Sequence, residues 1–436
     1  MKGFQIGVLI FFGVFVLLGV LIFSGAIKIG GGKSASDAVS SPSITIWGTV
    51  PAKKLAPAIT LSTQGSGMTV KYVAKDPRTY DEEILKAFAF GGLPDAFLLS
   101  QDLIFKYEDK IINIPFTYFP ERTYDDSFVR AAEIFKKGEG FLGFPIFTDP
   151  LIMYYNQDLL EAAGFTTPPK YWSDLFEYAP ALTKINEALK IDKAGVGLGE
   201  FTNVKNAKEI FSALMLQLNN DMVARDPITN RYSPTLSASS NVSSKPAIQS
   251  LDFYSGFSDP VKDIYSWNKS MKSSDQEFIS GDLAIYFGLA SEFEGIKAKN
   301  PNLNFDIAPI PQVKELPTII TYADVYALAI PINSAKGQIA LSIASSLSSG
   351  PAAAGISGAS GYAPIRRDLI SAPNQTKYTK VYYGAALDSR SWIDPDDKKT
   401  TEIFTRMFEN VLSGLSEPSE AVGTADTELK LLLLKK

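Results

Sequence analysis

The side chains best placed to do chemistry in this chain are carboxylates and amides that directly follow predicted strands. Ser100 and Asp102 come after the apolar run 95–99, and Glu200 and Asn203 come after a VGLG segment. The chain has no histidine and no cysteine. The commonest general base, thiol nucleophiles and thiolate zinc sites are therefore excluded, and any reaction would have to use Asp, Glu, Lys, Tyr or Ser.

The elements that would position these side chains alternate between strands and helices. Continuous apolar strands with helices between them predict an α/β fold whose mostly parallel sheet is covered on both faces. Turn-forming residues over 227–244 predict a solvated loop. The predicted strands are 44–47, 68–73, 95–99, 151–155, 283–287, 305–310 and 322–330, and the longest predicted helices are 207–218, 335–347 and 401–434.

The most specific pattern lies between residues 144 and 184. Asn156 can cap a helix that Gly164 ends, and Ser173 can cap a second helix after two prolines. This order closely resembles the "YN-kdl-aaG-pP-TW-eL-a-lT" signature of the family 1 extracellular solute-binding proteins, the maltose-binding-protein-like substrate-binding components of ABC transporters. Three later segments, around 278–311, 361–367 and 401–430, resemble the same family, so the resemblance covers roughly residues 44–430.

The resemblance implies a two-lobed periplasmic-binding-protein fold of type II, with a hinge between the lobes. Lobe 1 would combine residues 44–147 and 315–365, and lobe 2 would combine 150–312 and 368–436. Each lobe would carry half of the ligand contacts, so that binding favours the closed state. The family's role implies a monomer that captures a sugar, an oligosaccharide or another polyol and delivers it to an ABC transporter permease, with no cofactor and no metal.

The resemblance and the predicted strand ends together give a set of candidate ligand contacts. Ligands of open α/β sheets lie in the crevice at the carboxyl ends of strands, and sugars need aromatic plates together with hydrogen-bonding groups. No tryptophan stands near Phe293, where the family places one, which puts a maltose-type ligand in doubt. The candidates are Trp47, Thr49, Ser100, Asp102, Asp149, Glu200, Asn203, Glu292, Phe293, Tyr322, Asp324 and Trp392.

Several of these residues also have a purely structural interpretation. Trp47 could pack against the first helix, Asp102 could cap the helix that follows it, and Asp149 could set the turn before Pro150. Alternatively, Asp102 and Asp149 could face each other about 5–9 Å apart, as in a glycoside hydrolase. We predict a binding protein and no enzyme, with a carboxylate-based carbohydrate hydrolase as the less favoured alternative.

The N-terminus predicts a membrane anchor. Residues 3–27 carry no charge and are flanked by Lys2 and Lys28, and about 20 apolar residues span a bilayer. We predict a single-pass anchor over 1–29 and a flexible linker over 30–43, which hold an extracytoplasmic domain at the cell membrane. The alternative is a secreted protein, cleaved after Ala26.

Charge and composition narrow the remaining classes of partner. The net charge of −5 argues against a nucleic-acid partner. The cluster Asp394-Pro-Asp396-Asp397 lacks the glycine and the distal glutamate of an EF-hand loop, so it is predicted to cap a helix. A membrane-tethered sensor or adhesion module on the same fold stays open as an alternative function.

Overall fold

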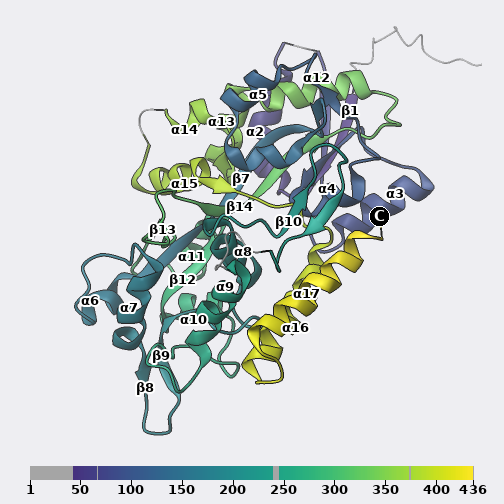
Figure 1. The fold of residues 1–436 in the computed structure, drawn as a ribbon. Helices are drawn as coiled ribbons and strands as arrows, with labels where there is room; N and C mark the ends of the chain where they lie inside the picture. The colour runs from purple at the N-terminus through teal and green to yellow at the C-terminus, as the bar shows by residue number, and fades with distance from the viewer. Residues whose placement is uncertain (1–42, 66, 239–244, 373–374, 436) are drawn as a thin grey trace, which may run out of the picture. The chain divides into compact units, whose positions relative to one another are not determined.

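Two long strands, β7 (Phe144–Asn156) and β14 (Thr321–Ala329), run through the centre of the fold (Figure 1). The computed structural model describes residues 43–435 apart from 66, 239–244 and 373–374, and these form one unit. β7 and β14 pair antiparallel, with Tyr326 opposite Phe147 and Asp324 opposite Asp149. β7 continues beyond this shared stretch and pairs there with further strands, so it contributes to two halves of one large sheet.

The first half of the sheet has the strand order β2–β1–β3–β14–β7. β1 (Ser43–Gly48) runs parallel to both β2 (Thr69–Ala74) and β3 (Ala96–Ser100), and β3 runs antiparallel to β14. The short strand β15 (Ala363–Pro364) adds to β7. The apolar residues of β3 are all buried, as expected for a strand covered on both faces.

The second half of the sheet forms around the C-terminal part of β7. Here β7 pairs antiparallel with β12 (Leu283–Leu289) and with β13 (Phe305–Pro309), and β12 runs parallel to β9 (Ile191–Val196). The sheet is therefore mixed, not mostly parallel as predicted, because every pairing of β7 is antiparallel. The edges are completed by β8 (Lys184–Ile185), which pairs with β9, and β16 (Ser389–Arg390), which pairs with β14.

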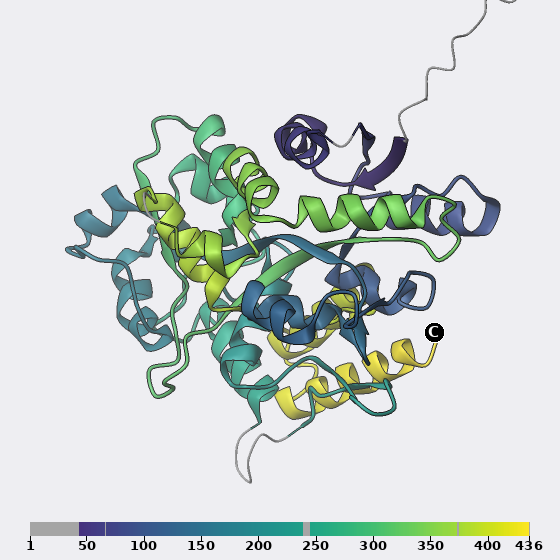
Figure 2. The same cartoon turned by 90° about the horizontal axis from the view of Figure 1, so that it is seen from above.

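Helices fill the connections between these strands (Figure 2). α2 packs against α12 and α13, and α16 packs against α17, while both of the last two contact α9. Before β7 the helices are α2 (Ala52–Thr63), α3 (Tyr80–Phe90), α4 (Gln101–Tyr107) and α5 (Glu121–Ser127). Between β7 and β14 they are α6 (Gln157–Ala162), α7 (Leu175–Leu182), α8 (Ala207–Gln217), α9 (Pro246–Ser255), α10 (Ser274–Ser280) and α11 (Phe293–Lys299). After β14 they are α12 (Gly337–Leu347), α13 (Gly350–Ser360), α14 (Arg367–Ile370), α15 (Lys377–Leu387), α16 (Asp397–Leu412) and α17 (Pro418–Leu433).

Local signals in the 144–184 segment were only partly predictive. The Asn156 side chain accepts a hydrogen bond of 3.1 Å from the Leu159 amide, so the predicted cap of α6 is confirmed. Ser173 is not the cap of α7, because a short 3-10 helix over 172–174 precedes α7 and Asp174 is the residue directly before α7.

The predicted loop 227–244 contains part of a hairpin, β10 (Val223–Arg225) and β11 (Tyr232–Pro234).

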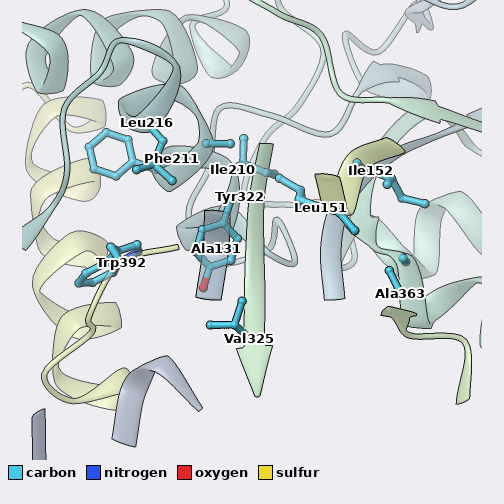
Figure 3. Close-up of a cluster of buried hydrophobic side chains, with 14 of the residues drawn as sticks. Ala131, Leu151, Ile152, Ile210, Phe211, Leu216, Tyr322, Val325, Ala363 and Trp392 are labelled. Atoms are coloured by element: carbon cyan, nitrogen blue, oxygen red, sulfur yellow. The ribbon is translucent and has the colours of Figure 1, made fainter. Parts of the chain in front are cut away.

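The core brings α8 onto β14 (Figure 3). Phe211 and Leu216 of α8 are fully buried, as is Val325 of β14, and Tyr322 is only 3 % exposed. Burying side chains of this size is worth on the order of 1.5–3 kcal/mol each. This packing fixes the N-terminal turn of α8 beside the first residues of β14, which becomes important for the site described below.

Gly199, just beyond β9, gives a first prediction about stability. Its φ of +113° is disfavoured for residues with a side chain, and a Cβ there would lie 2.5 Å from the Ser258 amide nitrogen. We expect Gly199→Ala to lower the free energy of unfolding by about 2 kcal/mol, measured by urea denaturation. Gly384→Ala is the matched control: Gly384 is exposed within α15 with open space around it, so alanine should be neutral or stabilising by about 0.5–1 kcal/mol. Equal effects of the two changes would contradict the prediction.

Within the described residues, no single helix is both long and apolar enough to cross a membrane. Two consecutive helices, Gly337–Leu347 and Gly350–Ser357, are bent by 68° to each other. Taken together they have the length and composition of a membrane span, and only these two properties support that interpretation. The predicted anchor over 1–29 and nearly all of the linker over 30–43 lie outside the residues that the structure describes.

Candidate functional site

A cavity of about 290 Å³ opens where the two halves of the sheet meet β14. One wall comes from the ends of β1 and β3 and from α3 and α4, and the other comes from the first turns of α8 and α16. The lining residues are Thr49, Pro77, Tyr80, Asp81, Ser100, Gln101, Asp102, Leu103, Lys208, Glu209, Tyr322, Asp324, Tyr326, Asp394 and Asp397.

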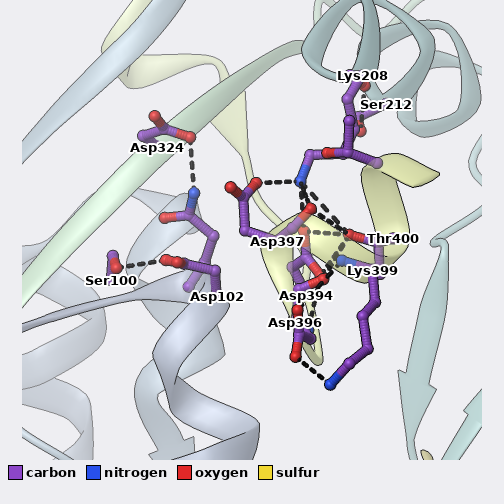
Figure 4. Close-up of polar contacts among 12 residues, drawn as sticks. Ser100, Asp102, Lys208, Ser212, Asp324, Asp394, Asp396, Asp397, Lys399 and Thr400 are labelled. Carbon is purple, nitrogen blue, oxygen red and sulfur yellow. Dashed lines mark hydrogen bonds and ion pairs between the residues drawn. The ribbon is translucent and has the colours of Figure 1, made fainter. Parts of the chain in front are cut away.

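The first wall is tied to β14 by Gln101. Its side-chain amide nitrogen donates to Asp324 Oδ1 at 2.6 Å and to the Tyr322 hydroxyl at 3.1 Å, while its oxygen accepts from the Val325 amide. Next to it, the Ser100 hydroxyl donates to Asp102 (Figure 4). These contacts hold the start of α4 and the crossing strand in a defined geometry, so the carboxylates of Asp102 and Asp324 have fixed positions.

The second wall is organised by Lys208 of α8. Its ammonium group, nearly buried, forms ion pairs with Asp397 and, at 2.7 Å, with Asp394 (Figure 4). Burial opposes the charge on Lys208, but the two carboxylates outweigh it and raise the lysine pKa. Asp396 accepts a 3.1 Å hydrogen bond from the Lys399 amide and caps α16, so the capping role predicted for this cluster is confirmed.

The carboxylates of the cavity are perturbed electrostatically. The pKa of Asp102 is raised to about 6, mainly by burial and to a smaller extent by the charges of Asp397 and Asp394, while the Ser100 hydrogen bond opposes the rise. Burial also raises the pKa of Asp324, with Glu209 and Asp149 adding to the shift, and that of Glu209. Carboxylates from both walls therefore act on one another across the same space.

Three tyrosines add aromatic surface to the cavity. The Tyr80 hydroxyl donates to backbone oxygens of Trp47 and Leu98, and the Tyr322 hydroxyl donates to Asp324 at 2.7 Å. Tyr326 stacks on Phe147 with ring centroids 4.7 Å apart.

A second cavity of about 560 Å³ shares part of the lining of the first and is bordered also by Arg78, Lys106 and Lys398. The arrangement offers hydrogen-bonding groups and tyrosine rings to a polar solute.

Five of the predicted ligand contacts line this cavity. The end of β1 contributes Thr49, the β3–α4 junction contributes Ser100 and Asp102, and β14 contributes Tyr322 and Asp324. Their contact with a solute stays a prediction. The fold brings these five residues together from three separate segments of the chain.

Four other predicted residues lie outside the lining, and three of them make contacts within the protein. Asp149 is 2 % exposed and accepts a 2.9 Å hydrogen bond from the Ser291 amide. Asn203 bonds to the backbone of 268 and 271 and accepts from the Trp267 ring nitrogen. Glu292 forms an ion pair with Lys205 and accepts from the Tyr286 hydroxyl. Glu200 is 6 % exposed, and one of its oxygens lacks a hydrogen-bond partner among the described residues.

The three predicted stacking aromatics also lie outside the lining. Phe293 is buried, 4.7 Å from the ring of Tyr378. Trp392 is 3 % exposed and its ring nitrogen donates to Ser212 at 3.0 Å. The ammonium of Lys75 lies 3.8 Å from the centre of the Trp47 ring. Aromatic surface in the cavity therefore comes from tyrosines.

Sequence reasoning missed most of the second wall. Lys208 and Glu209 sit in the first turn of an amphipathic helix, where polar residues are usually solvated. Only the Asp394–Asp397 cluster gave a signal, and it was interpreted as a cap. The lining residues that were not predicted, over both walls and β14, are Pro77, Tyr80, Asp81, Gln101, Leu103, Lys208, Glu209, Tyr326, Asp394 and Asp397.

No group of three or more His, Cys, Asp or Glu side chains is arranged to hold a metal ion in the part of the chain that the structure describes. In the cavity, Asp394 and Asp397 instead pair with Lys208, and Asp81 pairs with Lys106. Asp102 and Asp324 accept hydrogen bonds from neutral hydroxyl and amide donors.

The family can be assigned by comparison with known proteins. Residues 59–381 match the model of the family described as bacterial extracellular solute-binding protein. This chain belongs to that family. The cavity therefore lies in a protein of a class that captures solutes outside the cytoplasm. No curated protein matches the chain in sequence.

Solved structures show that this solute-binding protein has the two-lobed fold of its family. The sugar-binding protein MalE from Xanthomonas citri is similar with a TM-score of 0.71 and 18 % identity, over 90 % of this chain and 98 % of that one. An ABC substrate-binding protein (Lmo0181) from Listeria monocytogenes, in complex with cycloalternan, is similar with a TM-score of 0.70 and 17 % identity, over 91 % and 100 %. UgpB from Mycobacterium tuberculosis, in complex with glycerophosphocholine, is similar with a TM-score of 0.70 and 17 % identity, over 91 % and 99 %.

Proposed function

We propose that this solute-binding protein captures a sugar or oligosaccharide in the cavity beside β14 and delivers it to an ABC transporter permease. The observation that carries the proposal is the lining: hydrogen-bonding side chains and three tyrosines converge on one space from both walls and from the crossing strand. Sugars need this combination. Similar structures described with cycloalternan and as a sugar-binding protein support the choice of ligand class.

Capture would proceed by hinge closure. We propose that residues 44–147 with 315–365 form one lobe, that 150–312 with 368–436 form the other, and that β7 and β14 carry the hinge. Since lining residues such as Asp102 and Glu209 stand on opposite walls, a solute that contacts both binds the closed state better and shifts the population towards it. The uncharged run 3–27 would anchor the monomer to the membrane, with the binding domain outside.

The carboxylates of the site would bind and not catalyse. Asp102 and Asp149, the pair considered for hydrolysis, are placed differently, since Asp102 lines the cavity and Asp149 is engaged with the Ser291 amide. We therefore propose binding without turnover. Incubation of the purified full chain with labelled oligosaccharides should leave them intact, and a labelled cleavage product would contradict this.

The binding itself is testable by thermal unfolding of the purified full chain. A ligand at 100 times its dissociation constant should add about 2.7 kcal/mol to the free energy of unfolding, a shift of several degrees. The panel would contain mono- and oligosaccharides, polyols and glycerol phosphodiesters. We expect a shift with one sugar class that is lost in Asp102→Ala.

Asp263→Ala is the matched control for that variant. Asp263 is exposed and does not line the cavity, so the shift should persist. Loss of the shift in both variants would mean that it does not come from the cavity. A well-folded sample that no compound of the panel stabilises would overturn the proposed function.

A further inference from the structure

The cavity contains more negative than positive charge. Six carboxylates line it, from Asp81, Asp102, Glu209, Asp324, Asp394 and Asp397, against the single ammonium of Lys208. The charge of Lys208 is already shared by Asp394 and Asp397, and Asp81 pairs with Lys106 at 2.6 Å. In the described part of the chain no ion pair reaches Asp102, Glu209 or Asp324, and Lys208 acts on Asp102 and Glu209 only through its more distant charge. The carboxylates around this small space therefore outnumber its positive charge.

Asp102 and Asp324 accept their hydrogen bonds from neutral donors. Ser100 donates to Asp102, and Gln101 and Tyr322 donate to Asp324, in each case to the Oδ1 oxygen. An ionised carboxylate offers about four acceptor positions, so both side chains keep capacity for further donors. Glu209 adds a carboxylate from the opposite wall.

We propose that the solute of this cavity carries a cationic group, an ammonium or a guanidinium, bound by Asp102, Glu209 and Asp324. The inference rests on the proposed function, because the cavity and the family make this place the solute site, and the carboxylates then set the charge of the solute. An amino sugar or an oligosaccharide of amino sugars meets both requirements. Its hydroxyl groups can hydrogen-bond with the polar lining, and its ammonium group can pair with the three carboxylates.

The electrostatics favour a cation over a neutral sugar. Burial raises the pKa of all three carboxylates and repulsion from neighbouring carboxylates adds to the rise, so protons neutralise part of their charge when no cation is bound. The hydroxyl groups of a neutral sugar can occupy acceptor positions, but they do not remove this repulsion. An ammonium group both donates hydrogen bonds and cancels this repulsion. The tyrosines are compatible with this ligand, because aromatic faces attract cations as well as the weakly apolar faces of sugars.

The test compares amino sugars with their neutral counterparts. Titration calorimetry of the purified full chain at about pH 6.5 would use glucosamine against glucose, galactosamine against galactose, and the β-1,4-linked disaccharide of glucosamine against cellobiose. In each pair an ammonium group replaces one hydroxyl per ring, so the monosaccharides differ at one position and the disaccharides at two. We expect at least one amino member to bind 10-fold or more tightly than its neutral counterpart, with affinity that falls as NaCl rises.

Two variants locate the effect. Glu209→Gln should reduce the preference for the amino member several-fold, because it removes one carboxylate and keeps the size of the side chain. Glu161→Gln, an exposed position of α6 outside the cavity, makes the same change of charge and should leave the preference intact.

The outcomes separate the two proposals. Binding of the neutral members alone, or equally tight binding of both members, would overturn the cationic ligand while the sugar-binding function stands. Binding of spermidine or agmatine with no sugar bound would support the cationic group and overturn the sugar. No binding of any cationic probe would overturn the inference.

Discussion

Lys208→Met should destabilise the protein by about 3–5 kcal/mol at pH 7.5, as measured by urea denaturation. Lys208 is 8 % exposed and is the cation that both Asp394 and Asp397 contact. Methionine retains the length of the side chain but removes the charge. Asp394, itself 3 % exposed, would keep its hydrogen bonds from Thr400 but would be left as a buried carboxylate without a counter-ion.

The dependence of this loss on pH provides an internal check. Burial already raises the pKa of Asp394 above its ordinary value while Lys208 lowers it, so the variant should raise it further. As pH falls, Asp394 should bind a proton at a higher pH in the variant than in the wild type, so the cost of removing Lys208 should shrink.

Lys399→Met is the matched control for this prediction. Lys399 pairs with Asp396 at 2.6 Å, three residues away on the same helix, but its side chain is 56 % exposed. Exposed ion pairs contribute less than about 1 kcal/mol. A cost below 1 kcal/mol for both variants would show that solvent screens the Lys208 contacts and that Lys208 does not hold the second wall together.

The fold was largely predictable where local signals and burial agree. The apolar runs at β1, β3 and β14 and the Asn156 cap all form as predicted. The prediction of a mostly parallel sheet was wrong at β7, because the residue pattern of a strand contains no information about whether its neighbours run parallel or antiparallel. The hairpin β10–β11 was not predicted, because turn-forming residues surround it and each of its strands has only three residues.

The site was predictable on one wall only. Rules about strand ends find Thr49, Ser100 and Asp102, since these residues follow strands. They cannot find Lys208 or Glu209, because a helical residue faces the cavity only through the tertiary packing of α8 on β14. The predicted stacking aromatics lie outside the cavity lining for a related reason: a large ring is most often buried, as Trp392 is here.

Asp149→Asn should stabilise the protein at pH 7.5, by about 2–4 kcal/mol. Burial raises the pKa of Asp149 to about 7, Glu292 adds to the shift, and the Ser291 contacts oppose it. Asp149 also lies directly opposite Asp324 in the register of β7 and β14, and like charges in that position repel. Asparagine removes the charge and keeps an oxygen that can accept from the Ser291 amide.

The sign of the pH dependence follows from the direction of the shift. The pKa of Asp149 is higher in the folded state than the ordinary value of 3.8, so between about pH 4 and pH 7 the folded state binds more protons than the unfolded state. The contribution of Asp149 to stability is therefore lost as pH rises through this window. The advantage of Asp149→Asn should be near zero at about pH 4 and greatest above pH 7, and urea denaturation across this range measures it.

Two further variants decide what the measurement means. Asp263→Asn changes an exposed carboxylate and should alter the free energy of unfolding by less than about 0.5 kcal/mol. Asp149→Ala removes the charge and also the acceptor of the Ser291 amide, so it should lack about 1–3 kcal/mol of the gain seen with asparagine.

If Asp149→Asn is instead less stable than the wild type at pH 7.5, Asp149 is ionised in the folded protein and its charge is stabilised by its surroundings. Its retention then needs no functional reason. If the gain is found, the wild type keeps an unfavourable charge on the strand that crosses between the two halves of the sheet, which is the expected pattern when function and not stability has selected the residue.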